Sequence, residues 1–263
     1  MSVILRPHVP PFAGTRAAPL DTSAPWEPAE GGSGPRTMAS ISGILESWNF
    51  TAPAAGSIAS ITGEIAGIAA AQATSTKQPT ASGGPAGASW DGGDVLVTSG
   101  LGAVVGGKSG LTVVISYVDS ITAGAVIAEL TASAIANNGS FSLDANAPTA
   151  GNLQALLRNG GANTTGSCAE ADATMKVLTA LFDYANHTIA LRINGVAQSL
   201  TITDLATTGT SAADELYIGG RGTTPTVPIT GSIGTLAIRN GVAQDADLAA
   251  LERIVGARSG ISF

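Results

Sequence analysis

The second half of the chain alternates apolar and polar residues with a period of two over short stretches. In residues 187–194, Ile189, Leu191 and Ile193 fall on one face of an extended chain, and the residues between them fall on the other. This pattern predicts a strand with one buried face. The same alternation predicts half-buried strands in GSFSLDA (139–145) and SLTIT (199–203).

One stretch, LTVVISYV at residues 111–118, is apolar on both faces. It is predicted to be a central strand that is covered on both sides. Asn-Gly pairs separate several of the segments, and these residues tolerate the positive φ angles of tight turns. Further strands are predicted at residues 95–98, 126–131, 153–158, 175–184, 216–218 and 233–238. Roughly ten short strands joined by such turns indicate an all-β sandwich rather than an α/β fold.

An amphipathic helix at about residues 245–257 is predicted near the end of the sequence. Leu248, Leu251 and Val255 form one apolar stripe at helical spacing. Acidic residues lie in the first turn and basic residues in the later turns, which matches the helix dipole. These charged residues are Asp245, Asp247, Arg253 and Arg258.

Two segments before the predicted strands are less regular. The apolar residues of segment 38–48 fall at helical spacing and predict a short helix there; they are Ile41, Ile44, Leu45 and Trp48. In residues 58–68 the isoleucines also fit a helical stripe, but their β-branched side chains suit a strand equally. Both interpretations of that second segment stay open.

Residues 1–36 contain seven of the 13 prolines. Because proline fixes φ and lacks an N–H group, neither a helix nor a central strand is expected there. The segment is predicted to be an extended anchoring arm, with a disordered leader as the alternative. Residues 37–263 are predicted to form the sandwich. Six apolar residues of the arm are candidates for docking it on a partner: Ile4, Leu5, Val9, Phe12, Leu20 and Trp26.

Composition narrows the classes of function. Charged residues make up 12% of the chain, against about 25% in an average soluble domain. The net charge is −7 and Lys and Arg form no cluster, which argues against nucleic acid as a partner. No run of about 20 apolar residues occurs, so no membrane span is expected. The single cysteine, Cys168, cannot build a disulfide framework, and the first residues do not match a secretory signal.

Three stretches together resemble one protein family. They are AAQATSTKQPTASGGPAGASWDGGDVL (70–96), HTIALRINGVAQS (187–199) and ELYIGGRGTTPTVPITGSIGTLAIRNGVAQDADLAALERIVGARSGI (215–261). In order and spacing they are similar to the laminin G-like branch of the concanavalin A-like lectin and glucanase superfamily, in the form often found in tailed-phage structural proteins. The resemblance covers about residues 48–263 and implies a jelly-roll sandwich with a short terminal helix. It is weak for function, because this sandwich hosts sugar binding, adhesion and catalysis alike.

The resemblance also supplies a test for catalysis. Glucanases of this superfamily carry carboxylates two residues apart on one strand, in the pattern E-x-D-x-E, and use a pair of them for hydrolysis. The nearest match is Glu170-Ala-Asp172-Ala-Thr174, in which Thr174 replaces the third carboxylate. This segment lacks strand patterning and is predicted to be an exposed acidic loop. We therefore expect no catalytic residues and no enzyme, and a divergent glycoside hydrolase is the least favoured class.

A cation site is also implied by the resemblance, at the turn SWDGGDVL. Asp91 and Asp94 occupy acidic positions of the family there, and calcium favours carboxylate and carbonyl oxygens. These two residues are the candidate metal ligands, and calcium is the candidate cofactor. The alternative is that both carboxylates cap the backbone of the turn. Trp90, which replaces a Phe of the family, is predicted to lie in the core.

Taken together, these features favour a non-enzymatic virion protein of a tailed phage, as a capsid decoration or as a fibre or spike component. The arm would anchor it to other virion proteins after folding in the host cytoplasm, and we expect a homo-oligomer. The alternative function is a carbohydrate-binding module for host-surface glycans. Few aromatic residues remain outside the predicted core to form a platform for sugar rings, and this argues against the carbohydrate-binding alternative without removing it.

Overall fold

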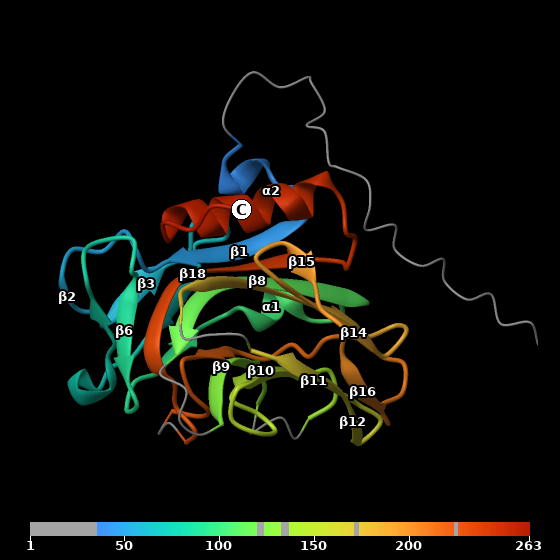
Figure 1. The fold of residues 1–263 in the computed structure, drawn as a ribbon. Helices are drawn as coiled ribbons and strands as arrows, with labels where there is room; N and C mark the ends of the chain where they lie inside the picture. The colour runs from blue at the N-terminus through green and yellow to red at the C-terminus, as the bar shows by residue number, and fades with distance from the viewer. Residues whose placement is uncertain (1–35, 120–123, 133–136, 171–173, 224–225) are drawn as a thin grey trace, which may run out of the picture. The chain divides into compact units, whose positions relative to one another are not determined.

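The computed structural model describes residues 36–119, 124–132, 137–170, 174–223 and 226–263, and Arg36–Phe263 form one compact unit. Within this unit two antiparallel sheets, A and B, lie face to face, and one long helix lies on the outer side of sheet A (Figure 1). Residues 1–35 of the proposed arm, with the six candidate docking residues Ile4, Leu5, Val9, Phe12, Leu20 and Trp26, lie outside the described residues, as does Asp172; Arg36, the last residue of the proposed arm, belongs to the compact unit.

Sheet A has nine strands in the order β15-β14-β13-β8-β18-β6-β5-β2, and β1 also pairs with β18. The long strand β18 makes this branching, because β6 pairs with its first half and β1 with its second half. The strands are β1 (Ile44–Asn49), β2 (Gly56–Ser57), β5 (Thr80–Ala81), β6 (Ala88–Asp91), β8 (Gly110–Asp119), β13 (Lys176–Asp183), β14 (Thr188–Ile193), β15 (Val196–Ala197) and β18 (Thr230–Asn240).

Sheet B also has nine strands, in the order β16-β12-β11-β10-β9-β17-β7-β4-β3. They are β3 (Ser60–Thr62), β4 (Ala69–Ala71), β7 (Leu96–Thr98), β9 (Ala125–Leu130), β10 (Phe141–Ala145), β11 (Asn152–Asn159), β12 (Ala162–Ala169), β16 (Thr201–Asp204) and β17 (Leu216–Ile218). The helices are the 3-10 turns η1 (Met38–Ser40) and η2 (Ser75–Lys77), the short α1 (Gly102–Val105) and the long α2 (Ala246–Arg258).

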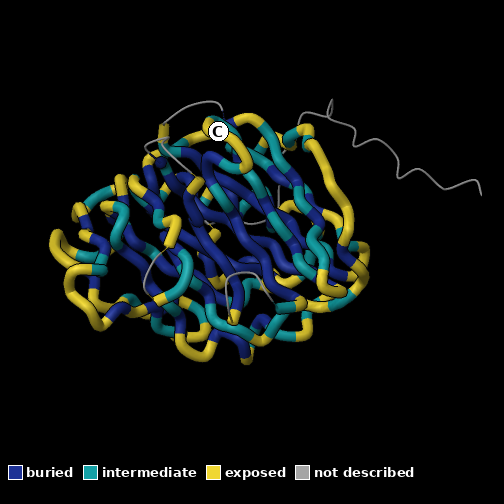
Figure 2. The backbone as a smooth tube through the Cα atoms, turned by 90° about the horizontal axis from the view of Figure 1, so that it is seen from below, coloured by how far each residue is buried: buried dark blue, intermediate teal, exposed yellow. Residues whose placement is uncertain are grey.

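The apolar strand β8 lies between β13 and β18 in the middle of sheet A, as its sequence predicts. Val113 and Ile115 point into the core between the sheets, whereas Val114 points to a second core beneath α2. Buried backbone therefore fills the centre of the molecule, and exposed residues concentrate in the turns (Figure 2). The predicted all-β jelly-roll sandwich with a short C-terminal helix is confirmed.

Helix α2 begins and ends close to the predicted bounds. The Asp245 side chain caps it by accepting a hydrogen bond from the Leu248 N–H at 2.9 Å. Its predicted apolar stripe, which also includes Leu251 and Val255, is buried against the outer face of sheet A. The central strands β8, β13 and β18 of sheet A are thus covered on both faces.

The short helix predicted in residues 38–48 is wrong. Only Met38–Ser40 form a 3-10 turn, and Ile44–Asn49 form strand β1 paired with β18. Trp48 is fully buried in the core between the sheets, where its indole N–H donates to the Ile68 carbonyl at 2.8 Å. Pairing with a free edge of β18 outweighs the weak helical spacing, because tertiary packing overrides a short local pattern.

Two further segments form the edge strands of sheet B, β3 at one edge and β16 at the other. Within residues 58–68 the structure has strand β3 and a loop rather than a helix. Edge strand β16 keeps the predicted alternation only in part, because Leu200 packs on the core but Ile202 is 47% exposed. Among the helices of the described residues, none is long and apolar enough to cross a membrane.

Candidate functional site

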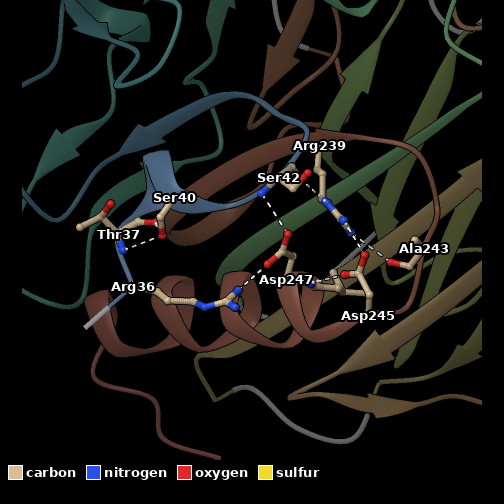
Figure 3. A network of polar contacts seen from close by, with 9 residues as sticks. Arg36, Thr37, Ser40, Ser42, Arg239, Ala243, Asp245 and Asp247 are labelled. Atoms are coloured by element: carbon tan, nitrogen blue, oxygen red, sulfur yellow. Dashed lines mark hydrogen bonds and ion pairs between the residues drawn. The ribbon is translucent and has the colours of Figure 1, made fainter. Parts of the chain in front are cut away.

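The described chain begins in a polar network at the N-terminal end of α2 (Figure 3). The Arg36 guanidinium forms an ion pair with Asp247, and the same carboxylate accepts a hydrogen bond from the Ser42 N–H at 3.1 Å. Arg239, which is buried at the end of β18, donates to the Ser42 carbonyl and to Asp245, each at 2.8 Å. Residue 36 is therefore fixed on the side of the sandwich that carries α2.

The outward face of sheet B is the opposite face of the sandwich, away from α2 (Figure 1). Its residues follow from the register, since Phe141, Leu143 and Ala145 of β10 point into the core and their neighbours point outward. Two rows of outward side chains cross the sheet and consist mostly of uncharged polar residues. The first row is Glu129, Ser142, Leu156, Thr165 and Thr203, and the second is Asp144, Gln154, Ser167 and Thr201.

An ion pair with a fully buried carboxylate lies at one end of the first row. Arg221 Nε donates to Glu129 Oε2 at 2.7 Å, and the Glu129 side chain is 0% exposed although it stands on an outward face. The segment that carries Arg221 runs beside β9, where the Gly219 N–H donates to the Ile127 carbonyl at 2.9 Å. Glycine is required at 219, because its φ is +85° and a Cβ would lie 2.0 Å from the Trp90 indole nitrogen.

Asp144 lies in the second row, diagonally across from Glu129. The Ser142 hydroxyl donates a hydrogen bond to its Oδ1. Burial raises the pKa of Asp144 to about 6; the Ser142 hydrogen bond and the Arg221 charge oppose this rise, and the Glu129 charge adds to it. The site therefore holds one carboxylate neutralised by arginine and one carboxyl group that can give or accept a proton near neutral pH.

Asp144→Asn is expected to change how stability depends on pH. The unfolded carboxyl group titrates near 3.8 and the folded one near 6, so the native state binds more protons between these values. The free energy of unfolding of the natural protein should therefore fall by about 3 kcal/mol as pH rises through this window. The variant should lack this loss, equalling the natural protein at about pH 4 and exceeding it at about pH 8. Urea unfolding at both pH values measures this, and equal slopes for the two proteins would contradict it.

Of the predicted calcium ligands, Asp91 is the last residue of β6 and Asp94 lies in the turn that follows, and both carboxylates interact with the backbone there. Asp94 Oδ2 accepts from the Asp91 N–H at 3.0 Å, and Asp91 Oδ1 accepts from the Gly93 N–H at 2.9 Å. Burial is the main cause that raises the pKa of Asp94. In the described part of the chain no group of three or more His, Cys, Asp or Glu could hold a metal ion. Calcium at Asp91 and Asp94 stays a prediction, and Trp90 is buried as predicted.

The predicted exposed acidic loop at Glu170 is wrong for that residue. Glu170 is buried, and it accepts hydrogen bonds from the Tyr117 hydroxyl at 2.5 Å and from Lys176 Nζ at 2.9 Å. The preceding residues form strand β12, which consists of Ala, Asn, Thr, Gly, Ser and Cys. Small residues bury well without being strongly apolar, so a strand made of them shows no alternation of apolar and polar residues.

Comparisons with known proteins give structural neighbours but no family. Scans against protein-family models and against curated proteins find no match. The CBM40 module of the Ruminococcus gnavus IT-sialidase, solved with α2,3-sialyllactose, is 23% identical over 57% of this chain and 85% of its own, with a TM-score of 0.45. A leech intramolecular trans-sialidase is 17% identical over 66% of this chain and 27% of its own, with a TM-score of 0.46. A SAP-like pentraxin from Limulus polyphemus is 14% identical over 56% of this chain and 70% of its own, with a TM-score of 0.43.

Proposed function

We propose that this chain is a non-enzymatic structural protein of a tailed-phage virion, anchored by residues 1–36 and displaying its sandwich as a capsid decoration or a fibre component. It would fold in the host cytoplasm before joining the particle. The proline-rich arm, the low charge and the sequence resemblance support this proposal. Glu170, the nearest match to a glucanase carboxylate, is buried against Lys176 and Tyr117, which supports a non-enzymatic role.

The observation that carries the proposal is the position of Arg36. Its ion pair with Asp247 fixes the start of the sandwich on the side covered by α2, and the outward face of sheet B lies on the other side. Attachment of a particle on the side that carries α2 would leave that outward face displayed. The test is whether a chain that lacks residues 1–35 still enters the particle, and loss of entry is the expected result.

The outward face of sheet B also favours a second role, the binding of a neutral host-surface glycan. Gln154, Thr165, Ser167 and Thr201 present hydroxyl and amide groups that donate and accept hydrogen bonds, as sugar hydroxyls require, whereas Ser142 is buried. The acidic residues at one end of the rows and the net charge of −7 disfavour a polyanionic ligand. Tyr217, opposite Glu129 in the sheet, adds an aromatic edge to this face.

Gln154→Ala is expected to weaken glycan binding about tenfold, because it removes a hydrogen-bonding side chain from the middle of the face. Gln244→Ala is the matched control, since Gln244 precedes α2 on the other side of the sandwich. A glycan array with calcium and with chelator identifies the ligand, and calorimetry then compares the two variants. No ligand on the array, or equal losses for both variants, would contradict binding at this face.

A further inference from the structure

A buried pair of opposite charges joins the two sheets at one end of the sandwich. Lys176 is the first residue of β13 in sheet A, and Glu170 directly follows β12 in sheet B. Their side chains are 3% and 1% exposed, and Nζ lies 2.9 Å from Oε1. Ion pairs this deep lose hydration that their mutual attraction regains only in part.

Tyr117 contacts both members of this pair. The Tyr117 hydroxyl donates to Oε1 at 2.5 Å, and Lys176 Nζ lies 5.6 Å from the centre of the Tyr117 ring. Glu170 Oε2 is buried and has no hydrogen-bond partner among the described residues, and the same is true of Asp119 Oδ1. Such orphaned buried oxygens are rare in folded proteins and call for a functional explanation.

We infer that Lys176 and Glu170 form an intramolecular amide cross-link between Nζ and Cδ, with release of one water molecule. Nζ lies 2.9 Å from Oε1, so the amine and the carboxyl group are already held in contact, and such proximity favours an intramolecular reaction. The cross-link replaces two buried charges with one neutral amide, and it removes the orphaned oxygen Oε2 as water.

The reaction balances without any other reactant. One proton passes from the Lys176 ammonium to Oε2, which leaves a neutral amine and a neutral acid. The Nζ lone pair forms the C–N bond at Cδ, and the carbonyl electrons move to Oε1, where the Tyr117 hydroxyl donates its hydrogen bond. The Cδ–Oε2 bond then breaks, Oε2 leaves as water with a second proton from Nζ, and the carbonyl bond at Oε1 forms again.

Asp119 is placed to carry the proton between these atoms. It lies two residues after Tyr117 on β8, on the same face of the strand, and Tyr117 is directly opposite Lys176 in the sheet. Burial raises the pKa of Asp119, and the Glu170 charge adds to this rise while Lys176 opposes it. Asn146 donates to its Oδ2, so only Oδ1 is available for proton transfer. Asp119 is thus a positioning and relay group rather than a partner of the cross-link.

Mass spectrometry of the full natural chain tests this inference. After denaturation and trypsin digestion, cleavage after Lys176 should be blocked, because an amidated lysine is not recognised. The peptide that spans Glu170 and Lys176 should be lighter than its sequence by one water and should give no fragments from within the ring. Cleavage after Lys176 and the full sequence mass would overturn the inference.

Two variants separate the cross-link from other causes of a blocked site. Lys176→Arg keeps the positive charge but cannot form the amide, so its peptides should show the full mass and cleavage after position 176. Tyr117→Phe keeps the ring but removes the donor to Oε1, and it should slow the appearance of the cross-link about a hundredfold after synthesis. Equal rates in the Tyr117→Phe variant and the natural chain would contradict the proposed role of Tyr117.

Discussion

Replacing Arg221 with alanine is expected to lower the free energy of unfolding by about 3–5 kcal/mol. Arg221 Nε lies 2.7 Å from Glu129 Oε2, and the Glu129 side chain is 0% exposed. Removal of the guanidinium takes the ion pair away from a fully buried carboxylate, and breaking such a pair costs far more than the pair itself contributes. Urea unfolding of the natural chain and the variant at neutral pH measures the difference.

A second ion pair of the same chemistry provides the control. Arg258 and Glu64 also lie 2.7 Å apart, and the Arg258 side chain is 23% exposed, close to the 26% of Arg221; the difference is that Glu64 is 32% exposed whereas Glu129 is 0% exposed. Arg258→Ala should therefore cost less than about 1 kcal/mol, as partly hydrated pairs do. Adding Glu129→Gln to the Arg221→Ala variant should recover part of the loss, because a neutral amide replaces the buried negative charge. Equal losses of unfolding free energy in Arg221→Ala and Arg258→Ala would contradict this account of the Glu129 ion pair.

The same substitution bears on the proposed glycan face. Arg221 and Glu129 stand at the end of the first row of outward side chains, which continues across β10 and β11. Loss of the ion pair should disturb this end of the face and weaken ligand binding together with stability. Gln154→Ala lies in the middle of the face and should weaken binding without a comparable loss of stability, so the two variants distinguish a positioning residue from a contact residue.

Much of the sandwich is predictable because its strands carry strong local patterns. The alternation of Ile189 and Leu191 predicts β14, and the continuous apolar run at 111–118 predicts the central strand β8. Helix α2 is predictable for the same reason, since Asp245 caps it and Leu248 opens its apolar stripe. In these elements the local pattern and the tertiary packing favour the same structure.

The candidate site is not predictable in this way, because its members come from three separate elements. Glu129, Asp144 and Arg221 meet only through the register of β9 with β10 and the path of the segment after β17. The local sequence does give one signal of the site: Glu129 is a single acidic residue in the apolar strand AVIAEL. Such a position indicates a buried charge, and a buried charge requires a partner. The sequence does not identify that partner.

The helix predicted in residues 38–48 fails for a related reason. A few apolar residues at helical spacing fit a strand equally well when the segment is short. Here the free edge of β18 favours the strand over the helix, because it pairs with Ile44–Asn49 and this pairing buries Trp48. Whether an edge is free depends on the whole sheet and is not visible in the local sequence.

Particle incorporation of a chain that lacks residues 1–35 tests the central claim most directly. The shortened chain keeps Arg36 and its ion pair with Asp247. Far-ultraviolet circular dichroism and the melting temperature should match those of the full chain, which would show that the sandwich folds. As a control in the full chain, Leu20→Asp with Trp26→Asp should also prevent incorporation, whereas Thr22→Asp with Ser23→Asp, which adds the same charge at polar positions, should not.

The measurement is the amount of each tagged protein in purified virions, compared with its amount in the lysate. The account predicts that the full chain enters the particle in fixed proportion to the other virion proteins. It predicts that the folded chain without residues 1–35 stays in the lysate. Incorporation of that shortened chain at the level of the full chain would contradict the account.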